Sequence, residues 1–121
     1  MENKYKKENT LVERVKKSHS KIKTYYPERV PIIIQRYKND NTLFELPKKQ
    51  FLVPYDMDLS RLIIVLRNQY KNIINQNTAL YFITDKGLIL CGSDIISSIY
   101  ETHKDEDQML YLFYCTENTF G

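Results

Sequence analysis

Cysteine is scarce in this chain of 121 residues, which contains only Cys91 and Cys115. The two lie far apart and belong to no Cys-x-x-Cys pair or dense Cys/His cluster. This pattern argues against a disulfide framework and against a structural zinc site. We therefore expect an intracellular, reducing compartment and a fold that needs no metal or other cofactor.

Long apolar runs are missing as well. No stretch approaches the ~20 residues that span a bilayer, and the polar first eight residues do not fit a secretory signal peptide. Stable attachment to a membrane would therefore require an anchor added to the chain.

Positive charge is concentrated near the amino terminus, although the net charge is only +3. Residues 1–25 carry eight Lys/Arg against three Glu. Such a segment can attract anionic lipid, nucleic acid or an acidic protein, or it can be the solvated face of a helix. Because no aromatic-rich basic groove accompanies it, nucleic acid is not expected as a partner.

Helices are predicted in both halves of a chain whose length suits one domain. A short helix is expected over residues 3–8, and a longer one over 11–24 begins at a Thr10–Glu13 capping box and ends before Pro27. Two further helices open at Asp58 and at Ser93 or Asp94. Their apolar stripes are Leu59, Leu62, Ile63 and Leu66 in the first and Ile95, Ile96, Ile99 and Tyr100 in the second.

Strands are predicted at five β-branched or apolar runs, residues 30–35, 49–53, 79–83, 88–90 and 109–115. The last run is nearly all apolar, as expected of a strand covered on both faces. The order is two helices, two strands, a helix, two strands, a helix and a final strand. This order matches the ubiquitin-like β-grasp, an α+β fold with a mixed sheet, here with a two-helix amino-terminal extension.

Four segments carry a family resemblance that covers nearly the whole chain. They are Tyr26-Pro-Glu-Arg-Val-Pro-Ile, Lys48-Lys-Gln-Phe-Leu-Val-Pro, Ile99-Tyr-Glu-Thr-His-Lys-Asp-Glu-Asp and Glu117-Asn-Thr-Phe-Gly. In order and near-family spacing they resemble the GABARAP-like ubiquitin-like autophagy modifiers, the autophagy-related protein eight family. The resemblance implies a helical extension over 1–25, a β-grasp core over 26–115 and a flexible conjugation tail over 116–121.

Five positions depart from the family pattern. Ser18 stands where the family usually has an acidic residue, Gln50 where it has lysine, and Gln69 where it has a basic residue. Met109 replaces a phenylalanine, and Thr116 replaces a glycine of the tail. Most of these changes fall around the ligand-binding groove of the family, so they bear on partner preference more than on the fold.

The resemblance gives the carboxyl end a chemical role. It implies that Gly121 is adenylated by an activating enzyme, passed as a thioester between conjugating enzymes and left as an amide on phosphatidylethanolamine. Glycine suits a narrow enzyme channel because it has no Cβ. Phe120, which lies in the same tail as Thr119, would offer the enzymes an apolar side chain to bind.

The resemblance also implies where such a protein acts. A cysteine protease processes or delipidates family members, and cargo receptors and adaptors bind them. We therefore expect the chain in the cytoplasm when free, and on autophagosome and related vesicle membranes when conjugated.

A peptide groove is the second implied site. Family members bind aromatic-x-x-aliphatic motifs as an extra strand on the sheet edge. The strand period agrees, since Gln50 and Leu52 would point one way and Phe51 and Val53 the other. The aromatic pocket would consist of Ile22, Pro31, Ile33, Gln50, Leu52 and Met109. The aliphatic pocket would consist of Phe51, Val53, Pro54, Leu62, Val65 and Leu66. Acidic flanks of the motif would meet Lys48, Lys49 and Arg67, and each apolar member could instead be plain core.

Three other functions compete with this interpretation. A thiol enzyme would need Cys91 or Cys115 with His103, but no orienting carboxylate is evident, so an enzyme is not expected. A modifier conjugated to a protein rather than a lipid, and an unconjugated adaptor that uses only the groove, remain open.

Overall fold

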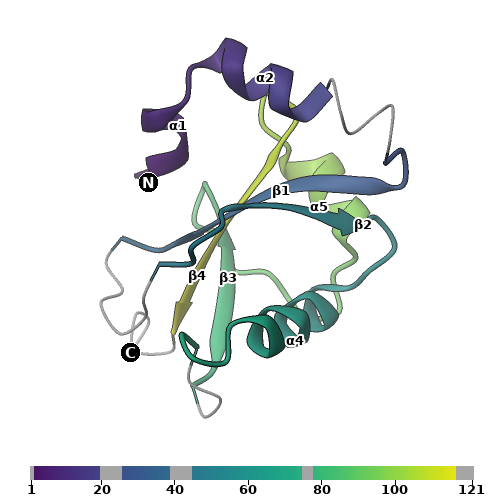
Figure 1. The fold of residues 1–121 in the computed structure, drawn as a ribbon. Helices are drawn as coiled ribbons and strands as arrows, with labels where there is room; N and C mark the ends of the chain where they lie inside the picture. Colours follow the sequence, from purple (N-terminus) through teal and green to yellow (C-terminus); the bar gives the residue numbers. More distant parts are fainter. Residues whose placement is uncertain (1, 20–25, 39–44, 75–77, 117–121) are drawn as a thin grey trace.

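The computed structural model describes residues 2–19, 26–38, 45–74 and 78–116. A four-stranded sheet lies at its centre (Figure 1), with the strands in the spatial order β2-β1-β4-β3. The strands are β1 (Arg29–Arg36), β2 (Gln50–Pro54), β3 (Leu80–Thr84) and β4 (Leu110–Thr116). β1 is antiparallel to β2 and parallel to β4, and β3 is antiparallel to β4. The sheet is therefore mixed, as the sequence predicts.

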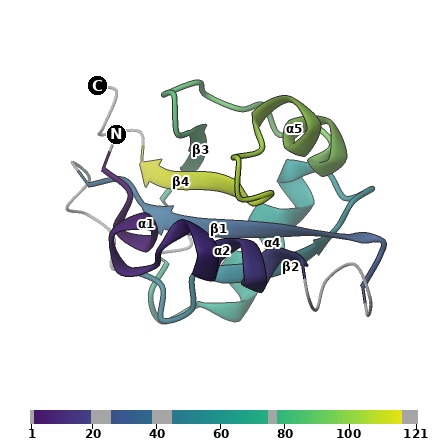
Figure 2. The same ribbon diagram turned by 90° about the horizontal axis from the view of Figure 1, so that it is seen from above.

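Helices cover both faces of this sheet (Figures 1 and 2). On one face lie α4 (Leu59–Gln69) and α5 (Ile96–His103), and on the other lie α1 (Lys4–Glu8) and α2 (Leu11–His19). The sheet thus has a hydrophobic layer on each side, which explains why every residue of the central strand β4 is buried.

The two layers follow from the alternation of side chains along the strands. Val30, Ile32 and Ile34 of β1 pack with the buried residues of α4 and α5. Ile33, between them, packs in the opposite layer with Tyr5 of α1. The β-branched run of β1 would be too apolar for a strand with one face exposed to solvent. The two layers bury it on both faces.

Two helix starts form as predicted. The Thr10 hydroxyl accepts from the Glu13 N–H at 3.3 Å, and the Glu13 carboxylate accepts from the Thr10 N–H at 3.1 Å, which completes the capping box of α2. At α4, the Asp58 carboxylate accepts from the Arg61 N–H at 2.8 Å. The predicted end of the second helix, over 20–24, lies outside the described residues.

One predicted strand and one predicted helix start in the second half of the chain are wrong. Residues 88–90 form no strand, only a single bridge between Ile89 and Ile83. α5 begins at Ile96 and not at 93 or 94, because Ile95 is extended, 37% exposed and bridged to Asp58. Backbone pairing of this segment with the chain before α4 takes precedence over helix formation.

Candidate functional site

The free edge of the sheet at β2 is the first feature of the candidate site. The carbonyl of Lys49 accepts from the Ile34 N–H at 2.8 Å, so residue 49 forms a hydrogen-bonded pair with β1. In an antiparallel ladder such pairs alternate, and the backbone groups of Gln50 and Leu52 therefore face outward. The guanidinium of Arg29 already reaches this edge and donates to the Leu52 carbonyl at 3.3 Å.

The other edge of the sheet is covered differently. Leu90 donates to the Phe82 carbonyl and Thr84 donates to the Leu88 carbonyl, each at 2.9 Å, so residues 88–90 occupy the outer side of β3. Within the part of the chain that the structure describes, β2 is thus the edge that can accept an additional strand.

The proposed aromatic pocket is built on the face of the sheet that carries α1 and α2. Pro31 lies opposite Leu52 and Ile33 lies opposite Gln50, so these four side chains share one face. Pro31 and Ile33 are buried, while Gln50 and Leu52 are half-buried and form the rim. The pocket member Ile22 lies outside the described residues.

Met109 lies under this pocket and not at its surface. The parallel pairing of Ile32 with Leu110 places it beside Pro31, in the same hydrophobic cluster as Ile33. Its side chain is 0% exposed, so it shapes the floor rather than the opening.

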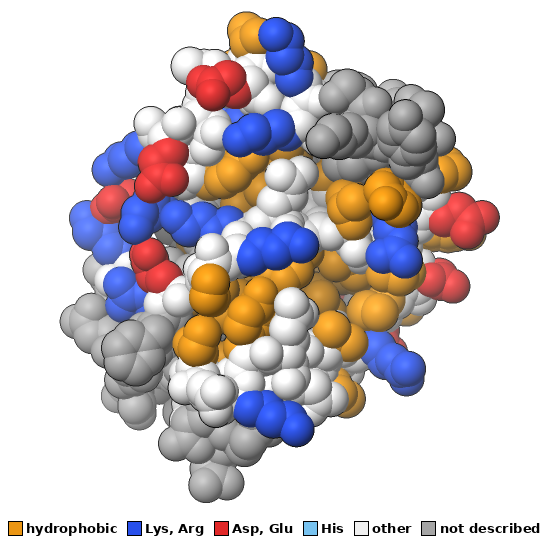
Figure 3. Space-filling model, in the orientation of Figure 1, with side chains coloured by type: hydrophobic (Ala, Val, Ile, Leu, Met, Phe, Trp, Pro, Cys, Tyr) orange, Lys and Arg blue, Asp and Glu red, His pale blue; other side chains and the backbone are white. Residues whose placement is uncertain are grey.

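The proposed aliphatic pocket is on the opposite face, against α4. Val53 is buried with Leu62 and Leu66 in the main core, and Phe51 packs half-buried against them. Val65 is 42% exposed. Figure 3 shows apolar side chains reaching the surface where α4 and β2 lie, between lysine and arginine side chains. Phe51 and Val65 are therefore the accessible members on this face, and Val53, Leu62 and Leu66 form the base. The half-buried Pro54 is two residues from Leu52 in β2, so the alternation places it on the other face of the sheet, against the prediction.

The three flanking cations have different surroundings. The Lys48 ammonium lies 5.5 Å from the centre of the Phe51 ring. Lys49 pairs with Glu8 of α1 at 3.9 Å. The Arg67 guanidinium donates to the carbonyl of Thr78 and so links α4 to the segment before β3. Of these three, Lys48 is therefore the cation that lies against Phe51, an accessible member of the predicted groove.

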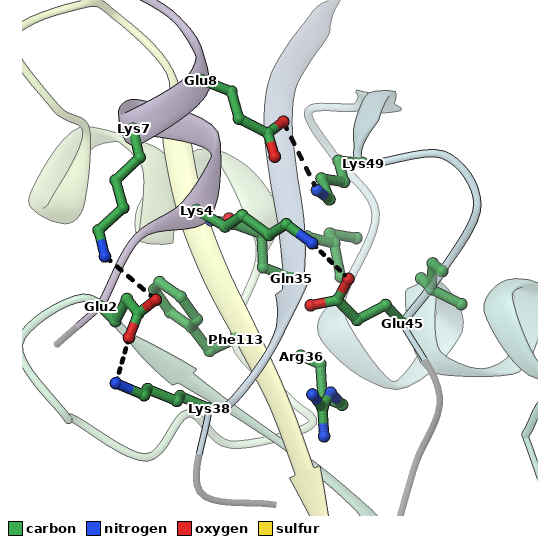
Figure 4. A pocket seen from close by; sticks show the side chains of 12 residues that line it. Glu2, Lys4, Lys7, Glu8, Gln35, Arg36, Lys38, Glu45, Lys49 and Phe113 are labelled. Carbon is green, nitrogen blue, oxygen red and sulfur yellow. Dashed lines mark hydrogen bonds and ion pairs between the residues drawn. The ribbon is translucent and has the colours of Figure 1, made fainter. Parts of the chain in front are cut away.

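A charged cavity of about 420 Å³ lies beside the start of β2 (Figure 4). Ion pairs cross it between Lys4 and Glu45 at 3.0 Å, and from Glu2 to Lys7 at 3.2 Å and to Lys38. The hydrogen bonds from Lys38 and Lys7 hold the pKa of Glu2 below its ordinary value. The Lys4–Glu45 pair connects α1 to the segment before β2, and the Glu2–Lys38 pair connects the residues before α1 to the segment after β1.

A buried carboxylate network is the feature that the sequence analysis missed. Asp107 is 0% exposed, although it belongs to the acidic run His-Lys-Asp-Glu-Asp. Its carboxylate accepts from Arg14 at 2.8 Å, from the Met109 N–H at 2.8 Å and from the Tyr111 hydroxyl. Burial, and next the bond to this carboxylate, raise the pKa of Tyr111 well above its usual range. The sequence does hold a signal for this network. It is a carboxylate directly before a buried strand, together with an arginine on a helix that covers the sheet.

The carboxyl-terminal tail follows the central strand. β4 ends at Thr116, one residue beyond the predicted end, and Thr116 lies opposite Leu80 of β3. The predicted conjugation residues Thr119, Phe120 and Gly121 lie outside the described residues. β1 separates β4 from the free edge at β2.

The residues of the competing thiol-enzyme hypothesis lie on different elements. Cys91 is exposed in the turn before α5, Cys115 is buried in β4, and His103 is the last residue of α5. Among the described residues, no group of three or more His, Cys, Asp or Glu could hold a metal ion. None of the described helices is long and apolar enough to cross a membrane.

Comparison with known proteins assigns this arrangement to a family. Residues 13–121 match the family model described as autophagy protein Atg8, ubiquitin like. An autophagy-related protein 8-like protein of Dictyostelium discoideum is 37% identical over 97% of this chain and 92% of its own length. Autophagy-related protein 8D of rice is 37% identical over 97% of this chain and 96% of its own length. The crystal structure of Trypanosoma brucei ATG8 superposes with a TM-score of 0.87 at 32% identity and 97% coverage of both chains. The fold is therefore ubiquitin-like, and the chain belongs to the Atg8 family of ubiquitin-like autophagy proteins.

Proposed function

We propose that this protein is a modifier conjugated through Gly121 to phosphatidylethanolamine, and that it recruits cargo receptors and adaptors by binding aromatic-x-x-aliphatic motifs at the β2 edge. It is not an enzyme in this proposal. It is the substrate of activating and conjugating enzymes and of a processing or delipidating cysteine protease. It is cytoplasmic when free, and lies on autophagosome and related vesicle membranes when conjugated.

The observation that carries the proposal is a strand edge at which the backbone groups of Gln50 and Leu52 face outward, with half-buried apolar side chains on each face of the sheet. An extended peptide that adds to β2 places alternate side chains on opposite sides of the sheet. One anchor then meets Leu52 and the floor formed by Ile33, and the other meets Phe51 and Val65. This geometry supports two anchors on one short extended motif.

The expected free energies of peptide binding favour weak, reversible recognition. Two buried anchors contribute on the order of 1.5–3 kcal/mol each, and ordering a flexible peptide costs several kcal/mol. Micromolar affinity is the natural expectation. Many copies on one membrane would raise the overall affinity through effective concentration.

The lipid part of the proposal rests on the carboxyl end and on family membership. Each buried CH₂ of an acyl chain contributes about 0.8 kcal/mol, and two chains hold where one binds only reversibly. Conjugation would therefore supply the anchor that the described helices do not provide.

Reconstitution tests the conjugation directly. The purified chain is incubated with activating and conjugating enzymes of the Atg8 pathway, ATP and phosphatidylethanolamine liposomes, and the product is identified by mass spectrometry. The proposal predicts a glycerophospholipid on Gly121 that is absent from a protein lacking Gly121. A product bearing a lysine side chain instead would favour a protein target, and no product with active enzymes would contradict conjugation altogether.

A further inference from the structure

Arg29 occupies part of the strand edge at which the peptide is proposed to bind. Its guanidinium donates to the Leu52 carbonyl at 3.3 Å. That carbonyl is one of the β2 backbone groups that face away from β1. Since Arg29 belongs to β1 and lies opposite Pro54, its side chain crosses β2 to make this bond. The guanidinium therefore lies on the outer side of β2, where an added strand would pair.

The Arg29 side chain takes this path on the face of the aromatic pocket. Arg29 precedes Pro31 by two residues in β1, and Pro31 shares its face of the sheet with Leu52. Arg29 thus borders the pocket at the end where β1 begins. A peptide whose aromatic residue entered this pocket would lie beside the Arg29 side chain.

A tyrosine ring supports the guanidinium in this position. The Arg29 N–H donates to the Tyr26 carbonyl at 3.1 Å, in the turn before β1. The guanidinium carbon lies 5.8 Å from the centre of the Tyr26 ring. A cation–π contact of this kind favours one position of an otherwise flexible side chain. The ring and the Leu52 carbonyl together hold the guanidinium at the edge, although Arg29 is exposed.

The guanidinium and an added strand compete for the same space. Neighbouring strands lie roughly 4.8 Å apart, and a nitrogen at 3.3 Å from the Leu52 oxygen lies within that gap. A peptide N–H can therefore take its place on the Leu52 carbonyl only after the guanidinium has moved. Charged side chains at edge strands are a general protection against unwanted strand pairing.

We propose that Arg29 is a gate at the β2 edge, whose guanidinium keeps the Leu52 carbonyl occupied until a motif peptide displaces it. This inference rests on the proposed peptide binding at β2. Displacement has a cost, because the bond from Arg29 is lost when a peptide N–H replaces it. Two anchor side chains in their pockets offset this cost, whereas an extended segment that offers only its backbone does not. The gate thereby makes the edge selective for segments that carry the motif.

The test compares the wild type with Arg29→Ala in calorimetric titrations. The aromatic-x-x-aliphatic peptide carries no charged side chain and has blocked termini, so it gains no ion pair from the guanidinium. Loss of the gate should tighten binding about threefold, as expected for release of one exposed hydrogen bond. Lys86→Ala removes an exposed cation from the turn after β3 and is the matched control, which should bind as the wild type does.

NMR relaxation of the Arg29 side chain gives a second readout in the wild type. The guanidinium should become more mobile when the protein is saturated with the peptide, because its acceptor has been taken. Equal or lower mobility in the complex would show that the guanidinium is not displaced, and would overturn the gate. Since this measurement needs no substitution, it decides the question even if Arg29→Ala does not fold by circular dichroism.

The titrations separate the gate from the peptide binding itself. A wild type that binds the peptide, with a folded Arg29→Ala that binds it no more tightly, overturns the gate and leaves the proposed function in place. Absence of binding by both proteins contradicts the proposed function, and the gate with it.

Discussion

Asp105 connects both amino-terminal helices to the loop before β4. Its carboxylate accepts from Lys6 of α1, from Arg14 of α2 at 3.5 Å and from the Asp107 N–H at 3.2 Å. Burial alone would raise the pKa of Asp105, but the bonds from Lys6 and Asp107 and the charges of Lys6 and Arg14 outweigh it and hold the pKa below its ordinary value of 3.8.

This shift predicts an acid-dependent loss of stability. A carboxyl group with a lowered folded-state pKa contributes stability above its unfolded pKa, and the contribution disappears as the pH falls through the folded-state pKa. Asp105→Asn should therefore be about 2 kcal/mol less stable than wild type near pH 7, and the difference should close as the pH falls below 3.8. Urea unfolding of both proteins across pH 7 to 2 measures this difference. A gap that is constant over the whole range would show that the charge of Asp105 is irrelevant.

At the scale of the elements, the entry to α5 is fixed against the start of α4. The Ser60 N–H and hydroxyl both donate to the Gly92 carbonyl, at 2.9 and 2.8 Å, and the Leu59 N–H donates to the Asp94 carbonyl at 2.9 Å. A Cβ added at Gly92 would lie 2.5 Å from the Ser60 Oγ. The two segments approach so closely that a Cβ at residue 92 fits only if the Ser60 hydroxyl moves.

A double-mutant cycle tests that contact. Gly92→Ala should lower the free energy of unfolding by about 1–2 kcal/mol, because the Ser60 hydroxyl must move and lose its bond. In a Ser60→Ala background the same substitution should cost much less, since the nearest remaining atom is the Ser60 Cβ at 3.6 Å. Equal costs in both backgrounds, measured by urea unfolding, would place the origin of the effect elsewhere.

The elements themselves differ in how far the sequence predicts them. The capping box at Thr10 and the cap at Asp58 depend on residues within one turn, so local pattern predicts them correctly. The false strand at 88–90 and the late start of α5 are decided by pairing with distant segments, which single-sequence patterns do not contain. Periodicity within a segment cannot predict which distant segments will pair with it.

The candidate site shows the same division. Alternation along β2 predicts which face each side chain occupies, and the register agrees for Pro31 and Leu52. The burial of Met109 is not predicted by alternation. Whether its side chain forms the floor or the opening of the predicted aromatic pocket depends on the helical layer packed over that face of the sheet. Asp107 was not predicted for a related reason. An acidic run is normally solvated, and this carboxylate is buried because the fold brings Arg14, the Tyr111 hydroxyl and the Met109 N–H to it.

At the scale of the whole molecule, the two proposed activities occupy separate parts of the sheet. The tail follows the central strand β4, while the peptide edge is at β2, with β1 between them. The opposite edge at β3 is already paired with residues 88–90. The conjugation proposed at Gly121 and the peptide binding proposed at β2 would therefore use different segments of the chain, with β1 between β4 and β2.

Peptide binding at β2 would depend on two neighbouring residues of the edge strand. Phe51 and Leu52 are both half-buried and lie on opposite faces of the edge strand, so each contributes to a different pocket. Replacing both removes part of two anchors, worth roughly 3 kcal/mol together, or about a hundredfold in affinity. Tyr81, 37% exposed on the far edge strand β3, offers a matched control.

The decisive measurement is calorimetric titration of an aromatic-x-x-aliphatic peptide into the wild type, the double variant Phe51→Ala/Leu52→Ala and the control Tyr81→Ala. Each protein is first shown to be folded by circular dichroism. We expect micromolar binding by the wild type and by Tyr81→Ala, and binding at least about a hundredfold weaker in the double variant. A folded double variant that binds the peptide as tightly as the wild type would contradict the assignment of the groove.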